Sequence, residues 1–424
     1  MEVVKTNQSV SKQTIEAAYQ TLQHVVTKTP LQYDRYLSER YACKVYLKRE
    51  DLQKVRSFKL RGAYYAITQQ ERAIIERGVV CASAGNHAQG VAYTCQELTI
   101  PGVIFMPTPT PQQKINQVQF FGGGMVDIRL VGDTFDEAAQ AAKVYATVNG
   151  LPFIAPFDDQ AIISGQGTVA LEIMQQAMQQ ELTIDYVLAA VGGGGLLSGV
   201  GVYTKAMSPS THVIGVEPEG APSMAAALAQ NGPVTLEQLD KFVDGAAVQR
   251  VGELTYQYVK QTTDAVYTVP EGEICQTILD LYSKQAIVVE PAGALSVAAL
   301  EQMKEQIKGK TVVCVISGGN NDISRMEEIE ERALIYQGLK HYFLVNFPQR
   351  PGALKEFVTK VLGPDDDITR FEYTKKVNRR TGPVVLGIQL KEAQAIESLL
   401  ERLTAFDSTF IDLSKHPSLY TLLV

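Results

Sequence analysis

Short runs rich in β-branched residues alternate with longer amphipathic stretches from Lys44 to Ser317, and this alternation restricts the folds open to the chain. Strands that alternate with helical crossovers form a parallel sheet with helices on its faces, so we predict an α/β fold. The run YVLAAV is apolar throughout, which indicates a strand buried on both faces. The expected strands are VYLKRE, VVCAS, GVIFM, VDIRLV, PFIAP, YVLAAV, HVIGVE and TVVCVIS. The expected helices are Phe58 to Ile75, His87 to Leu98, Phe135 to Val148 and Gly165 to Gln179.

The pattern changes after the acidic helical stretch SRMEEIEERALIYQG. The runs that follow are HYFLVNF, PQRPGALKEFVTKVLG, DITRFEYTKK, PVVLGIQL, EAQAIESLLERLTAF and TFIDL. Their order, β-α-β-β-α-β, is typical of a ferredoxin-like α+β unit. We therefore place a domain boundary near Gly338, with one region at residues 1–338 and a compact module at residues 339–424.

Charge and glycine content argue against two classes of partner. The chain has 39 Lys and Arg against 46 Asp and Glu, a net charge of −7, and no run of five or six basic residues. Nucleic-acid binding depends on neutralising phosphates, so no nucleic-acid partner is expected. The stretch between Asp185 and Lys205 has no charged residue and is about as long as a membrane span. Four glycines in its middle are costly in a helix, so we predict a strand, a turn and a helix there, and no membrane partner.

Cysteine and histidine placement excludes a disulfide framework and a zinc site. The cysteines are odd in number and widely spaced, as reduced core thiols are, and the histidines lack partners at i, i+4 spacing. The amino terminus has neither the apolar core of a signal peptide nor the Arg-rich pattern of a transit peptide, so a cytoplasmic location is expected. The five cysteines are Cys43, Cys81, Cys95, Cys275 and Cys314.

Four consecutive glycines, Gly192 to Gly195, follow the expected strand YVLAAV and open the expected helix LLSGVGVYTKA. At such a junction, backbone N–H groups and the positive end of the helix dipole converge on an anion. The alternative is a tight turn with close helix packing, but a structural turn rarely needs four glycines, so a phosphate cradle is favoured. Ser198 stands where a dinucleotide fingerprint needs its third glycine, so a dinucleotide fold is not supported.

Two further strand-to-helix junctions carry polar residues. In VVCASAGNHAQGVAYTC, Ser83, Gly85, Asn86 and His87 lie where an expected strand ends and a helix begins. Their donors suit a carboxylate or a phosphate, and the alternative is a polar cap for that helix. In TVVCVISGGNNDIS, Ser317 ends an expected buried strand, and the glycines after it permit close approach of a ligand. The alternative for this junction is a simple turn.

Lys59 lies between Phe58 and Leu60, near the start of an expected amphipathic helix. Partial desolvation lowers the pKa of a lysine below its reference of about 10.4, and the neutral amine is a usable nucleophile. A lysine at helical spacing is, on its own, usually a solvated surface amine. Together with a phosphate cradle, a carboxylate pocket and a polar strand end, Lys59 completes the set that a pyridoxal phosphate site requires.

The sequence closely resembles the biosynthetic threonine dehydratases, or threonine ammonia-lyases, which are fold-type II pyridoxal phosphate enzymes. The resemblance covers essentially the whole chain. It implies a two-lobed, tryptophan synthase β-like fold for residues 1–338, with a smaller lobe at roughly residues 55–160 inserted in the larger one. It implies an ACT-like regulatory domain for residues 339–424. The matching stretches are KREDLQKVRSFKLRGA, SAGNHAQG, GQGTVALEI, VGGGGLLSG, VEPAGA and SGGNND.

The resemblance also implies roles for single residues. Lys59 would be the catalytic residue and would bind pyridoxal 5'-phosphate covalently, with Phe58 in contact with the cofactor. Asn86 would hydrogen-bond the ring hydroxyl, Ser317 would face the pyridine nitrogen, and Gly245 would pass beside the ring. The cofactor phosphate would be held by the backbone of Gly192, Gly193, Gly194, Gly195 and Leu196. The substrate carboxylate would be held by Ser83, Gly85, Asn86 and His87.

The implied reaction is the α,β-elimination of L-threonine to 2-oxobutanoate and ammonia, the first committed step of isoleucine biosynthesis. L-Serine would give pyruvate by the same steps. Lys59 would remove the Cα proton as general base, and His87 would position the substrate. Ser317 cannot hold the pyridine nitrogen protonated as a carboxylate would, and the weaker electron sink suits elimination. The ACT-like domain implies feedback inhibition by isoleucine, and a homotetramer is expected.

Other activities remain open on the same scaffold, namely serine racemase, catabolic serine/threonine deaminase and β-replacing synthase. The regulatory module disfavours the synthases, and catabolic deaminases and racemases usually end near the catalytic part. A non-catalytic amino-acid sensor is the alternative from another class, and the module at residues 339–424 could serve oligomerisation alone. Racemase-like relatives follow their Glu-Pro pair with acidic metal ligands. Here Glu217 and Pro218 continue as EGAPSM, so no divalent metal is expected.

Overall fold

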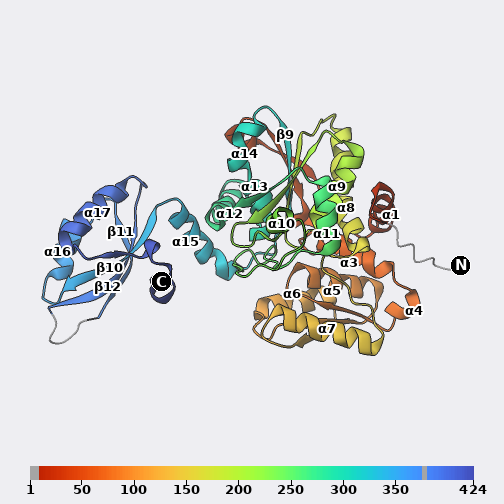
Figure 1. The fold of residues 1–424 in the computed structure, drawn as a ribbon, viewed down its shortest axis with the longest axis horizontal. Coiled ribbons are helices and arrows are strands. Elements are labelled where there is room, and N and C mark those ends of the chain that lie inside the picture. The colour runs from red at the N-terminus through yellow and green to blue at the C-terminus, as the bar shows by residue number, and fades with distance from the viewer. Residues whose placement is uncertain (1–8, 375–379) are drawn as a thin grey trace. The chain divides into compact units, whose positions relative to one another are not determined.

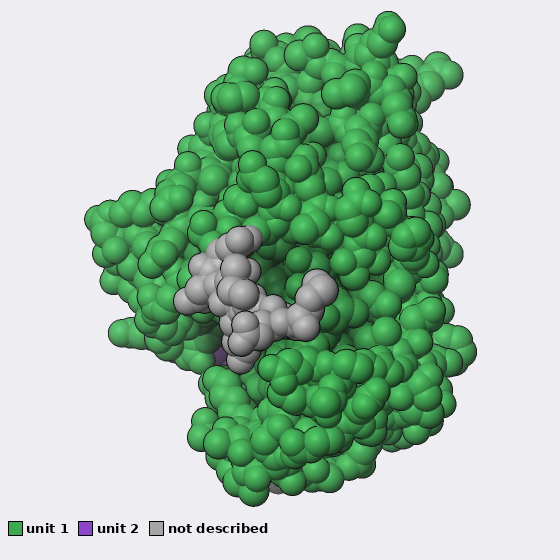
Figure 2. Space-filling model, turned by 90° about the vertical axis from the view of Figure 1, so that its right-hand side faces the viewer, with its two compact units in different colours: residues 1–324 green, residues 325–424 purple. Residues whose placement is uncertain are grey.

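The computed structural model describes residues 9–374 and 380–424, which fall into two compact units. The first unit is Met1–Ser324 and the second is Arg325–Val424; Figure 1 shows the fold of both, and Figure 2 shows mainly the surface of the first. Helix α15 (Met326–Tyr336) therefore belongs to the second unit, whereas the boundary predicted near Gly338 would assign it to the first.

The larger sheet of the first unit has the strand order β1-β2-β9-β6-β7-β8. All neighbours pair in parallel except β1, which runs antiparallel to β2. β6 and β9 are neighbours, with Tyr186 opposite Val312, so the residues after both strands meet at one edge of the sheet. The tetraglycine turn and Ser317 therefore lie at the same edge. The strands are β1 (Leu31–Asp34), β2 (Lys44–Arg49), β6 (Tyr186–Ala190), β7 (His212–Pro218), β8 (Ala265–Val269) and β9 (Thr311–Ile316).

A second, smaller sheet lies within the first unit and has three parallel strands in the order β3-β4-β5. Figure 1 shows helices α5, α6 and α7 gathered around this sheet, apart from the helices that cover the larger one. The strands are β3 (Val79–Ala82), β4 (Gly102–Met106) and β5 (Val126–Leu130). The helices are α5 (Asn86–Leu98), α6 (Gln112–Gly122) and α7 (Phe135–Asn149).

This architecture confirms the predicted α/β fold for the first unit. The remaining helices of that unit cover the larger sheet and join the two sheets. They are α1 (Lys12–Leu22), α2 (Arg35–Tyr41), α3 (Lys59–Thr68), α4 (Arg72–Ile75), α8 (Gln160–Gln179), α9 (Gly195–Met207), α10 (Ser223–Ala229), α11 (Glu253–Thr262), α12 (Glu271–Gln285), α13 (Pro291–Ala298) and α14 (Leu300–Ile307), with short 3-10 turns η1 (Glu50–Leu52) and η2 (Ile323–Arg325).

Several elements differ from the prediction. The strand predicted at PFIAP is wrong, because this segment forms one isolated bridge, between Val80 and Phe153. Prolines at 152 and 156 lack the N–H donors that a longer ladder needs. The helix predicted from Phe58 to Ile75 is divided into α3 and α4. Helix α8 begins earlier than predicted because the Asp159 carboxylate caps its first N–H groups. Strands β1 and β8 were not predicted.

The second unit has the predicted β-α-β-β-α-β order. Its sheet has the antiparallel order β11-β12-β10-β13, which confirms the ferredoxin-like unit. Helices α16 and α17 enclose a core with Phe343, Phe347 and Phe357. Lys375 and Lys376 of DITRFEYTKK lie outside the described residues. The elements are β10 (Lys340–Pro348), α16 (Ala353–Lys360), β11 (Asp367–Tyr373), β12 (Thr381–Gln389), α17 (Ala395–Phe406), β13 (Ile411–Asp412), the 3-10 turn η3 (Leu413–Lys415) and α18 (Pro417–Leu423).

The uncharged stretch between Asp185 and Lys205 folds as predicted into a strand (β6), a turn and a helix (α9). Within residues 9–374 and 380–424, the structure has no helix with the length and apolarity that a bilayer span requires. All five cysteines are buried and unpaired, as the sequence predicts.

Candidate active site

Lys59 is the first residue of α3, at the point where that helix meets the end of β9. The Phe58 N–H donates to the backbone oxygen of Ser317 at 3.1 Å, which ties the two elements together. Lys59 Nζ donates to the backbone oxygen of Pro156 at 2.8 Å and lies 5.5 Å from the centre of the Phe58 ring. Burial lowers the pKa of Lys59 to about 8, although the Glu290 carboxylate opposes this shift. A substantial fraction of the amine is therefore neutral near pH 8, as a nucleophile or base must be.

The tetraglycine turn connects β6 to the 13-residue helix α9. Gly194 has a φ of +93°, a conformation that side chains disfavour. A Cβ at Gly193 would collide with the Phe157 ring, and Thr255 Oγ1 donates to the Gly193 oxygen at 2.6 Å. Leu196, in the first turn of α9, is buried in the core. Packing thus fixes the backbone at a helix amino terminus, where N–H groups and the helix dipole favour an anion.

The loop between β3 and α5 carries the predicted substrate-binding residues. The Ser83 N–H donates to the backbone oxygen of Phe105 at 3.1 Å, and the Gly85 N–H donates to Ser83 Oγ at 3.2 Å. A Cβ at Gly85 would meet no atom within 4 Å, so open space adjoins the loop there. Helix α5 begins at Asn86. The open space therefore lies next to helix-terminal N–H groups that suit a carboxylate.

His87 is buried and electrically neutral. Its Nε2 lies 3.0 Å from the backbone oxygen of Ile154, and because that oxygen only accepts, we assign the proton to Nε2. Its Nδ1 is buried without a hydrogen-bond partner among the described residues, which suits an acceptor waiting for a donor. Burial and the neighbouring charge of Lys59 lower the pKa of His87 to about 3. A base with so low a pKa is weak, which supports a positioning role for His87.

Glu290 is a site residue to which the sequence pattern assigned no role. Its Oε1 accepts a hydrogen bond from Asn86 Nδ2 at 2.6 Å, while Asn86 Oδ1 accepts one from Asn320 Nδ2 at 2.7 Å. These two contacts fix the orientation of the Asn86 amide and leave its second N–H available. Burial and the charge of Asp244 raise the pKa of Glu290 to about 7. A charged residue inside the apolar stretch IVVEPAGAL is the signal that could have identified it.

Ser317 and Gly245 complete the cluster. Ser317 Oγ donates to the backbone oxygen of Ala292 at 3.2 Å. A Cβ at Gly245 would lie 2.9 Å from Ala292 Cβ and 3.9 Å from Glu290 Oε1, and one at Gly192 would lie 3.4 Å from the Gly245 oxygen. These contacts link the predicted residues from the glycine turn, the helix α5 loop and the end of β9 into one cluster. The role of each residue stays a prediction.

The cluster fits pyridoxal phosphate. The glycine turn leaves no room for side chains and so exposes backbone to a phosphate, and Lys59 is a buried amine for the aldehyde. The oriented Asn86 amide has a free N–H for the ring hydroxyl, and Ser317 supplies a hydroxyl at the end of β9.

Glu217, the first residue of the Glu-Pro pair that bears on the metal prediction, accepts a hydrogen bond at each of its carboxylate oxygens. Its Oε1 accepts from the Met224 N–H at 2.7 Å, and its Oε2 accepts from the Ala225 N–H at 2.9 Å. Burial raises the pKa of Glu217 to about 7. The carboxylate thus caps helix α10, and the absence of a divalent metal stays a prediction.

Comparison with known families defines the class of protein. Residues 22–318 match the model of the pyridoxal-phosphate dependent enzymes. Residues 331–423 match the C-terminal regulatory domain of threonine dehydratase. The fold and the cluster around Lys59 are therefore those of a pyridoxal phosphate enzyme that carries a regulatory domain.

Individual relatives narrow this class. The "L-threonine dehydratase biosynthetic IlvA" of Lactococcus lactis is 58% identical over 415 residues, which are 98% of this chain and 100% of that protein. The threonine deaminase isoform 2 structure from Solanum lycopersicum is 38% identical with a TM-score of 0.72, over 78% of this chain and 91% of that one. A serine racemase structure from Dictyostelium discoideum is 30% identical with a TM-score of 0.69. This match covers 74% of this chain and 100% of that one. The chain belongs to the biosynthetic L-threonine dehydratases.

Replacing Glu290 by glutamine is expected to lower the pKa of Lys59 further in the cofactor-free protein. The ionised carboxylate stabilises the protonated amine, so its removal shifts the Lys59 titration toward lower pH, by up to about one unit. The charges of Asp244 and Lys114 also shift the pKa of Glu290, and both residues are kept unchanged in the variant. The measurement is the pH dependence of Lys59 acylation, followed by peptide mass spectrometry. The exposed Glu181→Gln variant is the control, and a Glu290→Gln midpoint that stays unchanged or rises contradicts the assignment.

Proposed function

We propose that this enzyme converts L-threonine into 2-oxobutanoate and ammonia by α,β-elimination. Threonine loses the Cα proton and the β-hydroxyl, which together make one molecule of water. The resulting enamine is then hydrolysed by one water to 2-oxobutanoate and ammonia. L-Serine would give pyruvate in the same way. The observation that carries the proposal is Lys59, a buried amine with a pKa of about 8. The Lys59 amine donates a hydrogen bond to the backbone oxygen of Pro156, and the next residue, Phe157, packs against the glycine turn.

The residues of the cluster divide the work of this reaction. When bound, pyridoxal phosphate supplies an electron sink for the pair left at Cα. Lys59 takes the Cα proton, and a pKa near the working pH makes both its forms accessible. The helix dipole and N–H groups at the start of α9 hold the phosphate, and those at the start of α5 hold the substrate carboxylate. Ser317, a neutral hydroxyl, leaves the electron sink weak enough to favour loss of the β-hydroxyl.

We also propose that isoleucine inhibits the enzyme through its second unit. The match of residues 331–423 to the regulatory domain of threonine dehydratase supports this. Inhibition at a distance requires that isoleucine bind two enzyme states with different affinity. A homotetramer and a cytoplasmic location belong to the same proposal. Light scattering of the purified chain tests the tetramer, because the expected mass is four times that of one chain.

The test of the proposed function is a 2-oxobutanoate assay on the full-length enzyme with L-threonine, run with and without isoleucine. We expect keto acid that is lost on addition of isoleucine. A reaction without keto acid overturns the proposed activity. Keto acid that isoleucine does not reduce overturns the proposed regulation alone.

Two alternatives are separated by further readouts of the same reaction. The Dictyostelium relative is a serine racemase, so D-serine is measured when L-serine is the substrate. D-Serine as the main product favours a racemase. Borohydride reduction distinguishes an enzyme from an amino-acid sensor, since it should fix the cofactor to Lys59 and bleach its colour. Threonine binding without such an adduct favours the sensor.

A further inference from the structure

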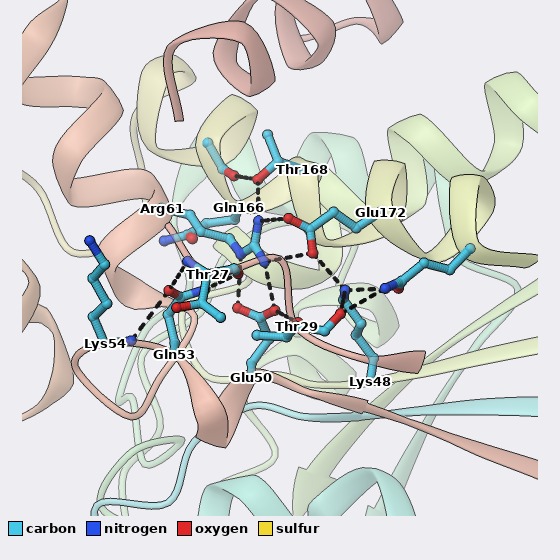
Figure 3. A network of polar contacts seen from close by, with 12 residues as sticks. Thr27, Thr29, Lys48, Glu50, Gln53, Lys54, Arg61, Gln166, Thr168 and Glu172 are labelled. Atoms are coloured by element: carbon cyan, nitrogen blue, oxygen red, sulfur yellow. Dashed lines mark hydrogen bonds and ion pairs between the residues drawn. The ribbon is translucent and has the colours of Figure 1, made fainter. Parts of the chain in front are cut away.

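A buried cluster of four charged side chains includes Arg61, which follows Lys59 by two residues in α3, and Figure 3 shows this cluster. Lys48, Glu50, Arg61 and Glu172 all have fully buried side chains. They come from four elements, namely β2, η1, α3 and α8. Two positive and two negative charges leave the cluster without net charge. The proposed reaction uses none of these residues, so their burial needs another explanation.

Arg61 is the centre of the cluster, and all five of its N–H groups are used. Its Nε donates to Glu50 Oε2 at 2.8 Å, and its Nη2 donates to Glu50 Oε1 at 2.7 Å and Glu172 Oε2 at 3.0 Å. Its Nη1 donates to Glu172 Oε1 at 2.8 Å and Thr168 Oγ1 at 3.2 Å. A guanidinium has five donors in one rigid plane. These bonds therefore fix the position and the tilt of the Arg61 side chain.

Lys48 extends the cluster and is equally saturated. Its Nζ donates to Glu172 Oε2 at 2.6 Å, to the backbone oxygen of Thr29 at 2.7 Å and to Gln176 Oε1 at 3.1 Å. Thr29 Oγ1 in turn donates to Glu50 Oε1 at 2.5 Å. An ammonium has three donors, so none remains free. The cluster is thus a closed network in which no partner can move alone.

Stability does not account for this cluster. Removing four charges from water is costly, and a buried ion pair often contributes no more stability than apolar residues of the same volume. Burial alone would raise the pKa of Glu50, but the Arg61 guanidinium, the Lys48 ammonium and the Thr29 hydrogen bond together outweigh burial and lower the pKa, so the charge persists. A fully satisfied polar network also makes its members rigid, because each hydrogen bond depends on direction as well as distance.

The element that this network orients carries Lys59. Arg61 follows Lys59 by two residues in the first turn of α3. The Gly62 N–H donates to Gln166 Oε1 at 3.2 Å, and Gly165 lies so close that a Cβ there would be 2.7 Å from the Arg61 oxygen. Among the described residues, no side chain caps the amino terminus of helix α3, so these contacts with α8 and η1 add to the Phe58 and Lys59 hydrogen bonds that hold its first turn.

We propose that Arg61 is a positioning residue that, through Glu50 and Glu172, fixes the first turn of α3 and thereby the Lys59 amine. The inference rests on the proposed function, in which Lys59 holds the cofactor and moves the Cα proton. Because the network has no net charge, it acts on where the amine lies rather than on its charge.

The test is the Arg61→Lys variant of the full-length holoenzyme, which keeps the charge but loses the planar fork. A displacement of about 1 Å at a reacting group lowers kcat by about 100-fold, so we expect a kcat loss of that order with KM changed less than about threefold. Borohydride should still fix cofactor to Lys59, and the visible circular dichroism of the bound cofactor should change. Met303→Ala, in the buried face of α14, is the control for lost stability.

The outcomes separate the two proposals. Wild-type enzyme without 2-oxobutanoate, or without a borohydride adduct at Lys59, defeats the proposed function. When the wild type is active and forms the adduct, the two variants decide the positioning role. That role is overturned if Arg61→Lys and Met303→Ala, which lose equal thermal stability, have the same kcat, the same KM and the same circular dichroism. If Arg61→Lys does not fold, Glu172→Gln is measured in its place. That variant keeps the side-chain shape but removes one charge, and the same outcomes decide.

Discussion

Lys59→Ala is expected to lower the rate of 2-oxobutanoate formation from L-threonine by about 10³-fold or more, because general-base catalysis alone contributes about 10²–10⁴-fold. The variant loses the amine that holds the cofactor and also the base for the Cα proton. The measurement is the initial rate at saturating threonine and cofactor. Added methylamine should restore part of the rate, since a small amine can act in the space that the side chain leaves.

The exposed Lys28→Ala variant is the matched control and should keep the wild-type rate. Cofactor content is measured in both variants by absorbance. If Lys59→Ala keeps wild-type activity with undiminished cofactor colour, another residue is the base and the site is misassigned.

Gly193→Ala is expected to weaken pyridoxal phosphate binding by about 10- to 100-fold. The added Cβ collides with the Phe157 ring, so the turn must move away from the position that presents its N–H groups. A hydrogen bond to a charged group contributes about 1.5–3 kcal/mol, which corresponds to about 10- to 100-fold in affinity. The measurement is titration of cofactor-free enzyme with pyridoxal phosphate, followed by absorbance.

Gly232→Ala is the control for this variant, because a Cβ at Gly232 meets no atom within 4 Å. The control should bind cofactor as the wild type does. Equal affinity of the two variants would show that the glycine turn is not the phosphate site.

The strand-to-helix junctions were predictable from the sequence, because each is a local pattern. A buried apolar strand followed by glycine or by short polar residues appears at the glycine turn, at the α5 loop and at Ser317. The strand order adds what the pattern cannot, namely that β6 and β9 are neighbours and that their loops meet. The family resemblance supplied the role of each residue, which no local pattern specifies.

The buried charges were not predictable in the same way. From the sequence alone we would place all four charged residues of the cluster on solvated faces, because charged residues are rarely buried unless they are paired. They are Lys48, Glu50, Arg61 and Glu172. Glu172 lies more than a hundred residues from both of its partners, Lys48 and Arg61. The pairing therefore depends on the tertiary fold. Glu290 stands out in sequence as a charge inside an apolar stretch, but its pairing with Asn86 was not predictable because Asn86 lies on a distant helix. PFIAP was misread because β-branched and aromatic content outweighed its two prolines.

The place of β9 in the larger sheet has a consequence for synthesis of the chain. β9 lies between β2 and β6, yet it is the last strand of that sheet to leave the ribosome. Until Ile316 has emerged, β1-β2 and β6-β7-β8 are separate sheets with open edges, which invite pairing between chains. Nascent or truncated chains that end before Thr311 should therefore aggregate or recruit chaperones, and the active cluster, which needs Ser317, can form only after nearly all of the first unit has been made.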